Sequence, residues 1–512
     1  MSRLRCETLV LPRAGGSARA PAGTTAVVVG GGIAGVAAAT VLCERGVEVT
    51  LVEKRPRLGG RAGGWPTELA TGERVEVEHG FHAFFRQYYN LRALLRRLDP
   101  CLGMLQPLDD YPILGPDGTV QSFAGLPRSS RLQLAALASR TPHLRATDLA
   151  RSNVRAALEM LRFDPERTYA RLDATSAATY LDSLGFPPAA RRMLFGVFAR
   201  SFFNAEHEMS AAELLMMFHF YALGNPEGLL FEVARDPAHT VIWSPFALWL
   251  SRRGARLRVG TSARRVNRSP RGSWRVECSD GTVEADRVVL ALDVGALRSV
   301  VQESPDLEPI RAHVGHLRVA RPFAVWRLWL DRPMAARRAP FAGTTGIGLL
   351  DNVSIYDRFQ QESARWARAH AGSVVELHAY AVSPDLDEAT IEDDLLAGLH
   401  ALYPEARGAR VVDERFALHQ DCPAFPPGEC ASRPRVATPF ADLALAGDFV
   451  AVPIPCALME RAAVSGILAA NTVLAPLGVM AEPLRSVPRR GLLAPLGLPR
   501  FARARSWSCN PG

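Results

Sequence analysis

The sequence contains a single lysine, Lys54, although lysine and arginine together account for 60 residues and the formal net charge is +8. The positive charge is therefore almost entirely arginine, which indicates codon usage in a GC-rich genome rather than a surface built for one ligand. A positive balance can also indicate a nucleic-acid or anionic-membrane partner. Because no nucleic-acid-reading motif accompanies the charge, we expect no nucleic-acid partner and mostly solvated arginine side chains.

Metal-ligand spacings and membrane spans are missing as well. The eight cysteines are scattered and form no CxxC pair, so we expect reduced thiols and no metal site. No uninterrupted apolar run is long enough to cross a bilayer, and residues 1–24 lack the apolar core of a secretory signal. These absences predict a cytoplasmic protein that is soluble or held at a membrane surface.

The most informative stretch that is present reads TTAVVVGGGIAGVAAATVLCERGVEVTLVEKRPRLGGRAGG. Its pattern predicts a buried strand at residues 27–29, a helix at 37–45 and a second strand at 47–52 that ends on Glu53. A G-x-G-x-x-G motif lies between the first strand and the helix. This strand–helix–strand order with a terminal acid is the dinucleotide-binding fingerprint of a Rossmann-like α/β fold.

Each glycine of the motif has a physical task. Gly30 permits the tight turn, Gly32 lets the backbone approach a pyrophosphate, and Gly35 lets the helix pack closely on the strand. The helix N-terminus then presents its positive end to the phosphates, and Glu53 is placed to accept hydrogen bonds from the adenosine ribose. The residues of this segment that we expect at the cofactor are Gly30, Gly32, Ile33, Ala34, Gly35, Glu53 and Lys54.

The letters RLGGRAGG that follow the acid indicate which dinucleotide binds. Gly60 allows close backbone contact, and Arg61 can form a charge-assisted bond to phosphate. This continuation resembles the FAD-binding family of amine oxidases and carotenoid desaturases. The resemblance implies FAD as cofactor and an α/β fold in which a discontinuous Rossmann-like domain is interleaved with an α+β substrate domain.

Two later segments extend the resemblance. In such flavoproteins the stretch GARLRVGTSARRVNRSPRGSWRVECSDGTVEADRVVLAL returns to the nucleotide domain, which implies that Val266 lies against the adenine. Near the C-terminus, LALAGDFVAVPIPCALMERAAVSGILAAN reads as a strand, a turn at Gly447 and Asp448, and a helix at about 457–473. The resemblance implies that Asp448 bonds the ribityl chain and that Met459, at the helix N-terminus, lies near the flavin pyrimidine. A carboxylate at a strand end can also be a helix cap.

The resemblance becomes more specific in GERVEVEHGFHAFFRQYYNLRALLRRL, which is similar to the GLHxFFGxYxNL sequence of plant-type phytoene and zeta-carotene desaturases. Together with FAVWRLWLD, CPAFPPGE and ALMERAA, its wording is closer to the bacterial carotene desaturase/methyltransferases, the isorenieratene synthases. Arg461 stands where the linear-chain desaturases have glycine. A guanidinium there is expected to change the flavin-side cavity, which argues against simple polyene desaturation and makes Arg461 a candidate catalytic residue.

Aromatic and imidazole groups are concentrated in VEVEHGFHAFFRQYY, where an alternating strand ends. Aromatic faces could stabilise a cation that forms during hydride removal, and His79 or His82 could accept a proton because imidazole titrates near neutral pH. A structural hydrogen bond at a strand end is the alternative role for either histidine. By resemblance Gly80, Phe81 and His82 also contact the flavin. The expected substrate-contacting residues are Phe81, Phe84, Phe85, Tyr88 and Tyr89.

The expected domain organisation alternates between two units. Residues 112–235 look mainly helical with a Met/Phe stripe, which is either core or the wall of an apolar tunnel. Residues 321–333 alternate as a strand of a substrate-domain sheet. The expected segments are a tail at 1–24, FAD-binding parts at 25–111, 236–300 and 431–475, a helical membrane-facing part at 112–235, a substrate sheet at 301–430 and a basic tail at 476–512.

The leading hypothesis is FAD-dependent oxidation of β-ionone rings, as in β-carotene, to aromatic rings with a 1,2-methyl shift. Linear carotene or isoprenoid desaturation, another amine-oxidase-type oxidation, and a redox-silent isomerase or carotenoid-binding role are the alternatives. The electron acceptor, oxygen or a quinone, is left open. Arginines interleaved with apolar residues at 126–163 and 489–507 predict peripheral membrane contact, with an ordinary arginine-coated surface as the alternative.

Overall fold

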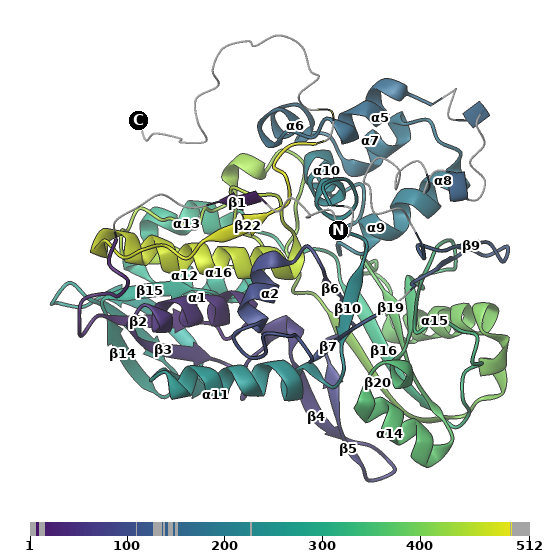
Figure 1. The fold of residues 1–512 in the computed structure, drawn as a ribbon, viewed down its shortest axis with the longest axis horizontal. Helices are drawn as coiled ribbons and strands as arrows, with labels where there is room; N and C mark the ends of the chain where they lie inside the picture. The colour runs from purple at the N-terminus through teal and green to yellow at the C-terminus, as the bar shows by residue number, and fades with distance from the viewer. Residues whose placement is uncertain are drawn as a thin grey trace.

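A computed structural model describes residues 7–9, 16–108, 110–125, 136, 139–141, 147–148, 152–225, 228–491 and 493. Within these ranges the chain forms two large sheets, four smaller sheets of two or three strands, and a group of helices (Figure 1). The first sheet is parallel, with the order β11-β3-β2-β15-β21. Its strands come from three distant parts of the chain: β2 (Thr25–Val29) and β3 (Glu48–Glu53), then β11 (Arg256–Val259) and β15 (Arg287–Leu290), and finally β21 (Leu443–Leu445).

The core of this sheet follows from its sequence. In β2, the residues 26–29 are apolar and almost fully buried, as expected for a central parallel strand covered on both faces. The helix α1 (Ile33–Glu44) begins directly after Gly32, four residues earlier than predicted. Its ten buried residues leave no polar face because it packs between the sheet and α16 (Leu458–Leu474), which the sequence placed within one residue.

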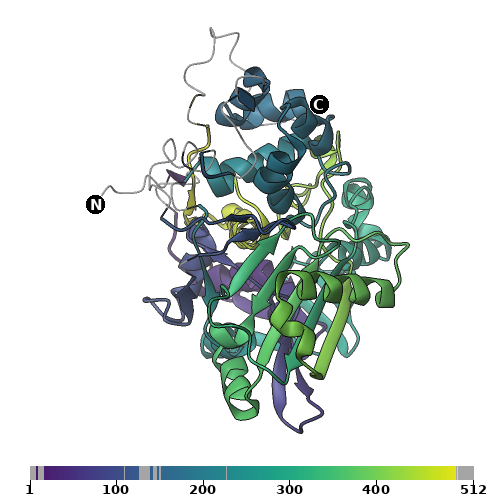
Figure 2. The same cartoon turned by 90° about the vertical axis from the view of Figure 1, so that its right-hand side faces the viewer.

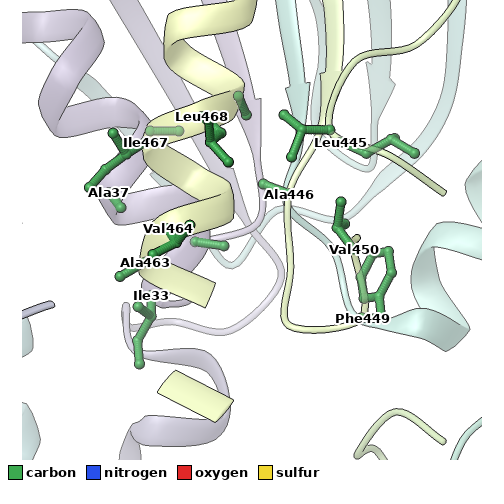
Figure 3. Packing of buried hydrophobic residues seen from close by; sticks show 14 of the residues in the cluster. Ile33, Ala37, Leu445, Ala446, Phe449, Val450, Ala463, Val464, Ile467 and Leu468 are labelled. Carbon is green, nitrogen blue, oxygen red and sulfur yellow. The ribbon is translucent and has the colours of Figure 1, made fainter. Parts of the chain in front are cut away.

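The two helices approach closely where α1 is richest in alanine. Ile33 and Ala37 face Ala463, Val464 and Ile467 of α16 (Figure 3). A Cβ atom at Gly466 would lie 2.1 Å from the carbonyl oxygen of Ala34, so only glycine permits this spacing.

The second sheet has seven strands in the order β20-β16-β19-β18-β17-β8-β9. Its bounds are β8 (Ile113–Leu114), β9 (Val120–Gln121), β16 (Phe323–Leu330), β17 (Phe341–Thr344), β18 (Asn352–Ile355), β19 (Ser373–Ala379) and β20 (Val411–His419). All eight residues of β16 are buried, including Arg327, so the strand is covered on both faces rather than alternating between core and solvent. The helix α15 (Glu388–Leu402) covers one face.

A separate group of helices lies above the two large sheets in the views of Figures 1 and 2. They include α5 (Val154–Leu161), α6 (Pro165–Leu172), α7 (Ala177–Ser183), α9 (Val197–Arg200), α10 (Ala211–Phe218) and the π-helical turn η3 (His219–Leu223). Residues 112–235, which were expected to be mainly helical, also contribute short strands at both ends. Strands β8 and β9 join the seven-stranded sheet, and β10 (Phe231–Ala234) pairs with β6 (Phe84–Phe85) and β7 (Leu105–Pro107).

Candidate functional site

A cavity of about 370 Å³ extends from the glycine loop after β2 to the inner face of the seven-stranded sheet. One end is lined by Gly30, Gly32 and Glu53 of the parallel sheet. The other end is lined by aromatic and polar side chains of the second sheet, including Phe341 and Tyr380. A single cavity therefore joins the predicted nucleotide loop to an aromatic wall.

The glycine loop has the geometry that a dinucleotide needs. Gly30 has φ +109°, and a Cβ atom at Gly35 would lie 1.8 Å from the carbonyl oxygen of Gly30, so the predicted tight turn and close packing are confirmed. A Cβ atom at Gly32 would instead point into open space, with Gly60 Cα 3.8 Å away. No side chain caps the N-terminus of α1, which leaves its first amide groups at the cavity for an anion such as a pyrophosphate.

The acid at the end of β3 is held in place by backbone groups. Glu53 is buried, and its carboxylate accepts hydrogen bonds from the N–H groups of Gly31 (2.6 Å) and Arg55 (2.8 Å). The carboxylate lines the cavity, and each oxygen retains a lone pair for a ribose hydroxyl. Lys54 also lines the cavity and forms an ion pair with Asp293 at 3.1 Å.

The two other predicted cofactor segments meet this loop. Arg61 donates a hydrogen bond from Nη2 to Oδ1 of Asp448 at 2.6 Å, although the residues are 387 positions apart. Gly447 and Met459 line the same cavity. Val266 does not: it is fully buried in β12 (Ala263–Arg268), and the cavity is lined instead by residues 261–263 just before it.

The aromatic stretch after β5 (Arg74–Glu78) divides between cavity and core. Phe81, Phe85 and Tyr88 line the cavity together with Gly80 and His82. Phe84 and Tyr89 are absent from its lining, so their predicted contact with substrate is not supported by the geometry. Phe84 is buried in the main core beside Phe85 because successive strand residues point to opposite faces. The hydroxyl of Tyr89 accepts a hydrogen bond from Asn225 at 2.6 Å.

The two predicted histidines have different surroundings. Nε2 of His79 lies 3.1 Å from Oδ2 of Asp421, and its ring stacks on His419 with centroids 3.7 Å apart. Its Nδ1 is buried, with no hydrogen-bond partner among the described residues. Burial and the neighbouring His79 lower the pKa of His82 to about 4, so the expectation that His82 titrates near neutral pH was wrong.

Arg461 does not reach the cavity, contrary to the expectation that it reshapes the flavin side. Its side chain is 3% exposed and forms an ion pair with Glu213 of α10. Glu213 also accepts a hydrogen bond from Arg433 at 3.1 Å, and both guanidinium groups lie over the ring of Phe425. Phe425 and Asp448 line the cavity, so Arg461 supports the site through the Phe425 ring and through a hydrogen bond from Nη1 to the Asp448 carbonyl oxygen at 3.3 Å.

Four polar residues of the aromatic end were not predicted. Asp421 lines the cavity beside His79, and a chain of hydrogen bonds connects Tyr380, His378 and Glu376. Although burial opposes its ionisation, the charge of Arg327 and the hydrogen bond from His378 lower the pKa of Glu376 to about 2. The sequence VVELHAY carries the signal, because residues 376, 378 and 380 alternate along one strand and share a face.

Comparison with known proteins agrees with this geometry. The family described as flavin containing amine oxidoreductase matches residues 33–474. A carotenoid phi-ring synthase of Streptomyces griseus is 50% identical over 493 residues, covering 96% of this chain and 95% of the relative. The carotenoid phi-ring synthase of Chlorobaculum tepidum is 28% identical (92% and 91% covered), and a probable zeta-carotene desaturase of Synechococcus elongatus is 25% identical (87% and 98%).

Solved structures show the same fold at low identity. A double mutant of putrescine oxidase has a TM-score of 0.63 at 17% identity, covering 88% of this chain and 99% of its own. Cyclohexylamine oxidase from Brevibacterium oxydans has a TM-score of 0.63 at 16% identity, covering 89% and 98%. The predicted α/β fold and FAD cofactor are confirmed. The chain therefore belongs to the flavin-containing amine oxidoreductase family, in which it groups with FAD-dependent enzymes of the carotenoid desaturase type.

Proposed function

We propose that this enzyme converts the β-ionone rings of a carotenoid, with β-carotene as the expected substrate, into aromatic rings and moves one methyl group in the process. The observation that carries the proposal is the similarity along 96% of the chain to a protein named carotenoid phi-ring synthase. In carotenoid nomenclature the phi end group is a trimethylphenyl ring, which is also the product of an isorenieratene-type synthase.

The balance of the reaction defines what the site must do. A β-ring contains one double bond and an aromatic ring three, so each ring loses four hydrogens as two hydride ions and two protons. A gem-dimethyl carbon cannot become aromatic, so one methyl group must move to the neighbouring carbon. FAD, when bound by the glycine loop and by Arg61, Asp448 and Met459, supplies the hydride acceptor.

The cavity walls fit a ring that becomes cationic when it loses hydride. Phe81, Phe85 and Tyr88 present aromatic rings, and aromatic faces stabilise a nearby cation by about 0.5–2 kcal/mol. Asp421 adds a carboxylate at the same wall. Burial opposes its ionisation, but the hydrogen bond and charge of His79 lower the pKa of Asp421 to about 2, so it remains anionic at neutral pH. Because the ring binds between these cavity walls, water has less access to the cation before the methyl group moves.

Incubation of purified holoenzyme with β-carotene and an electron acceptor tests this proposal. Products are separated by chromatography and identified by mass and by the absorption of aromatic end groups. Aromatic rings support the proposal, whereas a longer linear polyene would identify a linear desaturase. An isomer formed without flavin bleaching in the absence of an acceptor would identify a redox-silent enzyme. Parallel reactions with oxygen and with a soluble quinone determine the electron acceptor.

Peripheral membrane association is a second part of the proposal. Most of the arginine-rich stretch at 126–163 and of the tail at 489–507 lies outside the described residues. One described helix, Leu458–Leu477, is long and apolar enough to cross a membrane, but 72% of its apolar window is buried and it packs against α1. Flotation with anionic liposomes at low and high salt tests association, and no binding in either condition would refute it.

A further inference from the structure

A hydrogen-bonded chain of three side chains begins at the aromatic end of the cavity. The hydroxyl of Tyr380 lies 2.9 Å from Nδ1 of His378, and Nε2 of His378 lies 2.7 Å from Oε1 of Glu376. Tyr380 and His378 line the cavity, whereas Glu376 is fully buried behind them. The three residues follow one another on the same face of β19 and its C-terminal extension.

The surrounding groups determine where the protons lie. Arg327, opposite Glu376 on β16, donates a hydrogen bond from Nε to Oε2 of Glu376 at 2.8 Å and forms an ion pair with it. The hydroxyl of Tyr356 donates to Oε1 at 3.0 Å. Glu376 is therefore a carboxylate that only accepts hydrogen bonds, so Nε2 of His378 donates to it. When the ring carries this one proton, Nδ1 is the acceptor for the hydroxyl of Tyr380.

The phenol oxygen of Tyr380 keeps a free lone pair. It accepts one hydrogen bond from Nδ2 of Asn352 at 2.8 Å and donates its own proton to His378. Its side chain is only partly buried and borders the cavity. Burial also raises the pKa of Tyr380 above its ordinary value, which keeps the hydroxyl protonated between turnovers.

We propose that Tyr380 accepts the protons released by the carotenoid ring and passes its own hydroxyl proton to His378. This inference rests on the proposed function. After hydride has left for FAD, the electron pair of a neighbouring C–H bond becomes the new C=C bond. That proton moves to the Tyr380 oxygen as the hydroxyl proton moves to Nδ1, and the resulting imidazolium is stabilised by Glu376. A phenol is basic enough because a carbocation is a far stronger acid than a protonated phenol.

The predicted histidines are less well placed for this task. His79 also lines the cavity, but its Nε2 is engaged by Asp421, and its Nδ1 is buried with no hydrogen-bond partner among the described residues. His82 borders the cavity, but among the described residues no carboxylate is hydrogen-bonded to its ring to stabilise an imidazolium, as Glu376 is to His378. In this scheme Tyr380 is the catalytic residue. His378 positions the Tyr380 hydroxyl and accepts its proton, and Glu376 stabilises the resulting imidazolium.

Replacement of Tyr380 by phenylalanine tests the relay, with Tyr356→Phe as the matched control. The Tyr356→Phe variant also loses a hydroxyl group, one that donates a hydrogen bond to Glu376. The Tyr356 side chain, however, is buried and does not line the cavity. Tyr380→Phe should keep its FAD content and Tm, leave KM nearly unchanged, and lower kcat for carotenoid consumption about 100-fold or more. Its kcat should also lose the solvent deuterium isotope effect of the wild type. Tyr356→Phe removes one hydrogen bond to Glu376 but leaves the bond between Tyr380 and His378 in place, so it should lower kcat much less and keep the isotope effect.

A double variant adds a second readout. If the two residues act as one unit, Tyr380→Phe combined with His378→Asn should lower kcat no further than the stronger single change. A Tyr380→Phe kcat close to that of Tyr356→Phe, or an unchanged isotope effect, would overturn the relay. The proposed function is judged separately by product identity, since any flavin-dependent desaturation must also release a proton and can be followed as substrate consumption.

Discussion

Arg461 of α16 and Glu213 of α10 form a buried ion pair that joins the parallel-sheet domain to the helical region across 248 positions of sequence. Both side chains are almost completely excluded from solvent. Burial opposes ionisation of Glu213, but the charges of Arg461 and Arg433 lower its pKa to about 2, so the carboxylate stays charged. A buried charge that loses its partner is costly, which makes this pair a point where single substitutions act strongly.

Removing the carboxylate should therefore destabilise the fold. Glu213→Gln leaves the guanidinium groups of Arg461 and Arg433 without their charged partner and should lower the free energy of unfolding by about 3–5 kcal/mol. Arg461→Met should cost less, because Glu213 keeps Arg433. Glu159→Gln is the matched control, since its partner Arg171 is 58% exposed and such pairs contribute about 0–1 kcal/mol. Urea titrations measure all three, and equal effects for Glu213→Gln and Glu159→Gln would contradict the role of burial.

Two glycines of one motif should respond in opposite ways. Gly32→Val places a side chain in open space at the cofactor cradle and should give folded protein without bound FAD. Gly35→Ala drives a Cβ atom to 1.8 Å from the carbonyl oxygen of Gly30 and should prevent α1 from packing, so that little soluble protein forms. Circular dichroism and the flavin absorbance of purified protein separate the two outcomes. Full flavin content in Gly32→Val would place the pyrophosphate elsewhere.

Glu53 and Asp448, two acidic residues of the predicted FAD-binding site, should affect FAD binding and turnover differently. Glu53→Gln keeps the shape of the side chain but loses the charged acceptor, so FAD binding should weaken by about 1.5–3 kcal/mol. Asp448→Ala removes the partner of Arg61 and should lower turnover as well as FAD occupancy. Fluorescence titration of apoprotein with FAD, followed by turnover assays at saturating FAD, measures both effects. Titration curves identical to wild type for both variants would disconnect these residues from the cofactor.

His219 should make stability depend on pH. Burial lowers its pKa from 6.5 to about 4, although Nε2 is 2.6 Å from the carbonyl oxygen of Pro488. Between these values the unfolded chain binds a proton that the folded protein does not, so stability falls as the pH drops from 6.5 to 4. The contribution is up to about 1.4 kcal/mol per pH unit, or about 3 kcal/mol in total. Between pH 6.5 and 4, the free energy of unfolding of the wild type should fall by this amount relative to that of His219→Gln. If the difference between the two proteins does not change with pH, His219 is protonated in the folded state.

The local part of the fold was predictable from the sequence. The turn at Gly30, the strand β3 and the helix α16 depend on short-range patterns of glycine and apolar residues, and each was located within a few residues. The cofactor-facing position of Arg61 was predicted from the RLGGRAGG sequence, and that of Asp448 came from resemblance. Their contact could not be read from spacing, because it is formed by chain segments that meet only after both sheets are assembled.

The aromatic end was less predictable, for reasons that are also physical. Phe84 and Phe85 are equally apolar, and only the pairing of Phe85 with Phe231 on β10 determines which of them faces the cavity. Arg461 was expected at the cavity because it stands where the linear-chain desaturases have glycine. Its actual partner, Glu213, lies in a distant helix that the sequence alone does not bring next to it. Tyr380 and His378 were missed because a strand with alternating polar residues is usually half-exposed, whereas β19 is buried along its whole length.

The fate of the gem-dimethyl groups shows whether a methyl group migrates within the ring during aromatisation. β-Carotene labelled with carbon-13 at these methyl groups is incubated with the holoenzyme without any methyl donor, and the product is analysed by NMR and mass spectrometry. If hydride loss produces a ring cation, the aromatic product retains all the label, at two adjacent ring positions, and added S-adenosylmethionine does not change the rate. Loss of label, or a linear polyene that keeps intact gem-dimethyl rings, would refute aromatisation with a methyl shift.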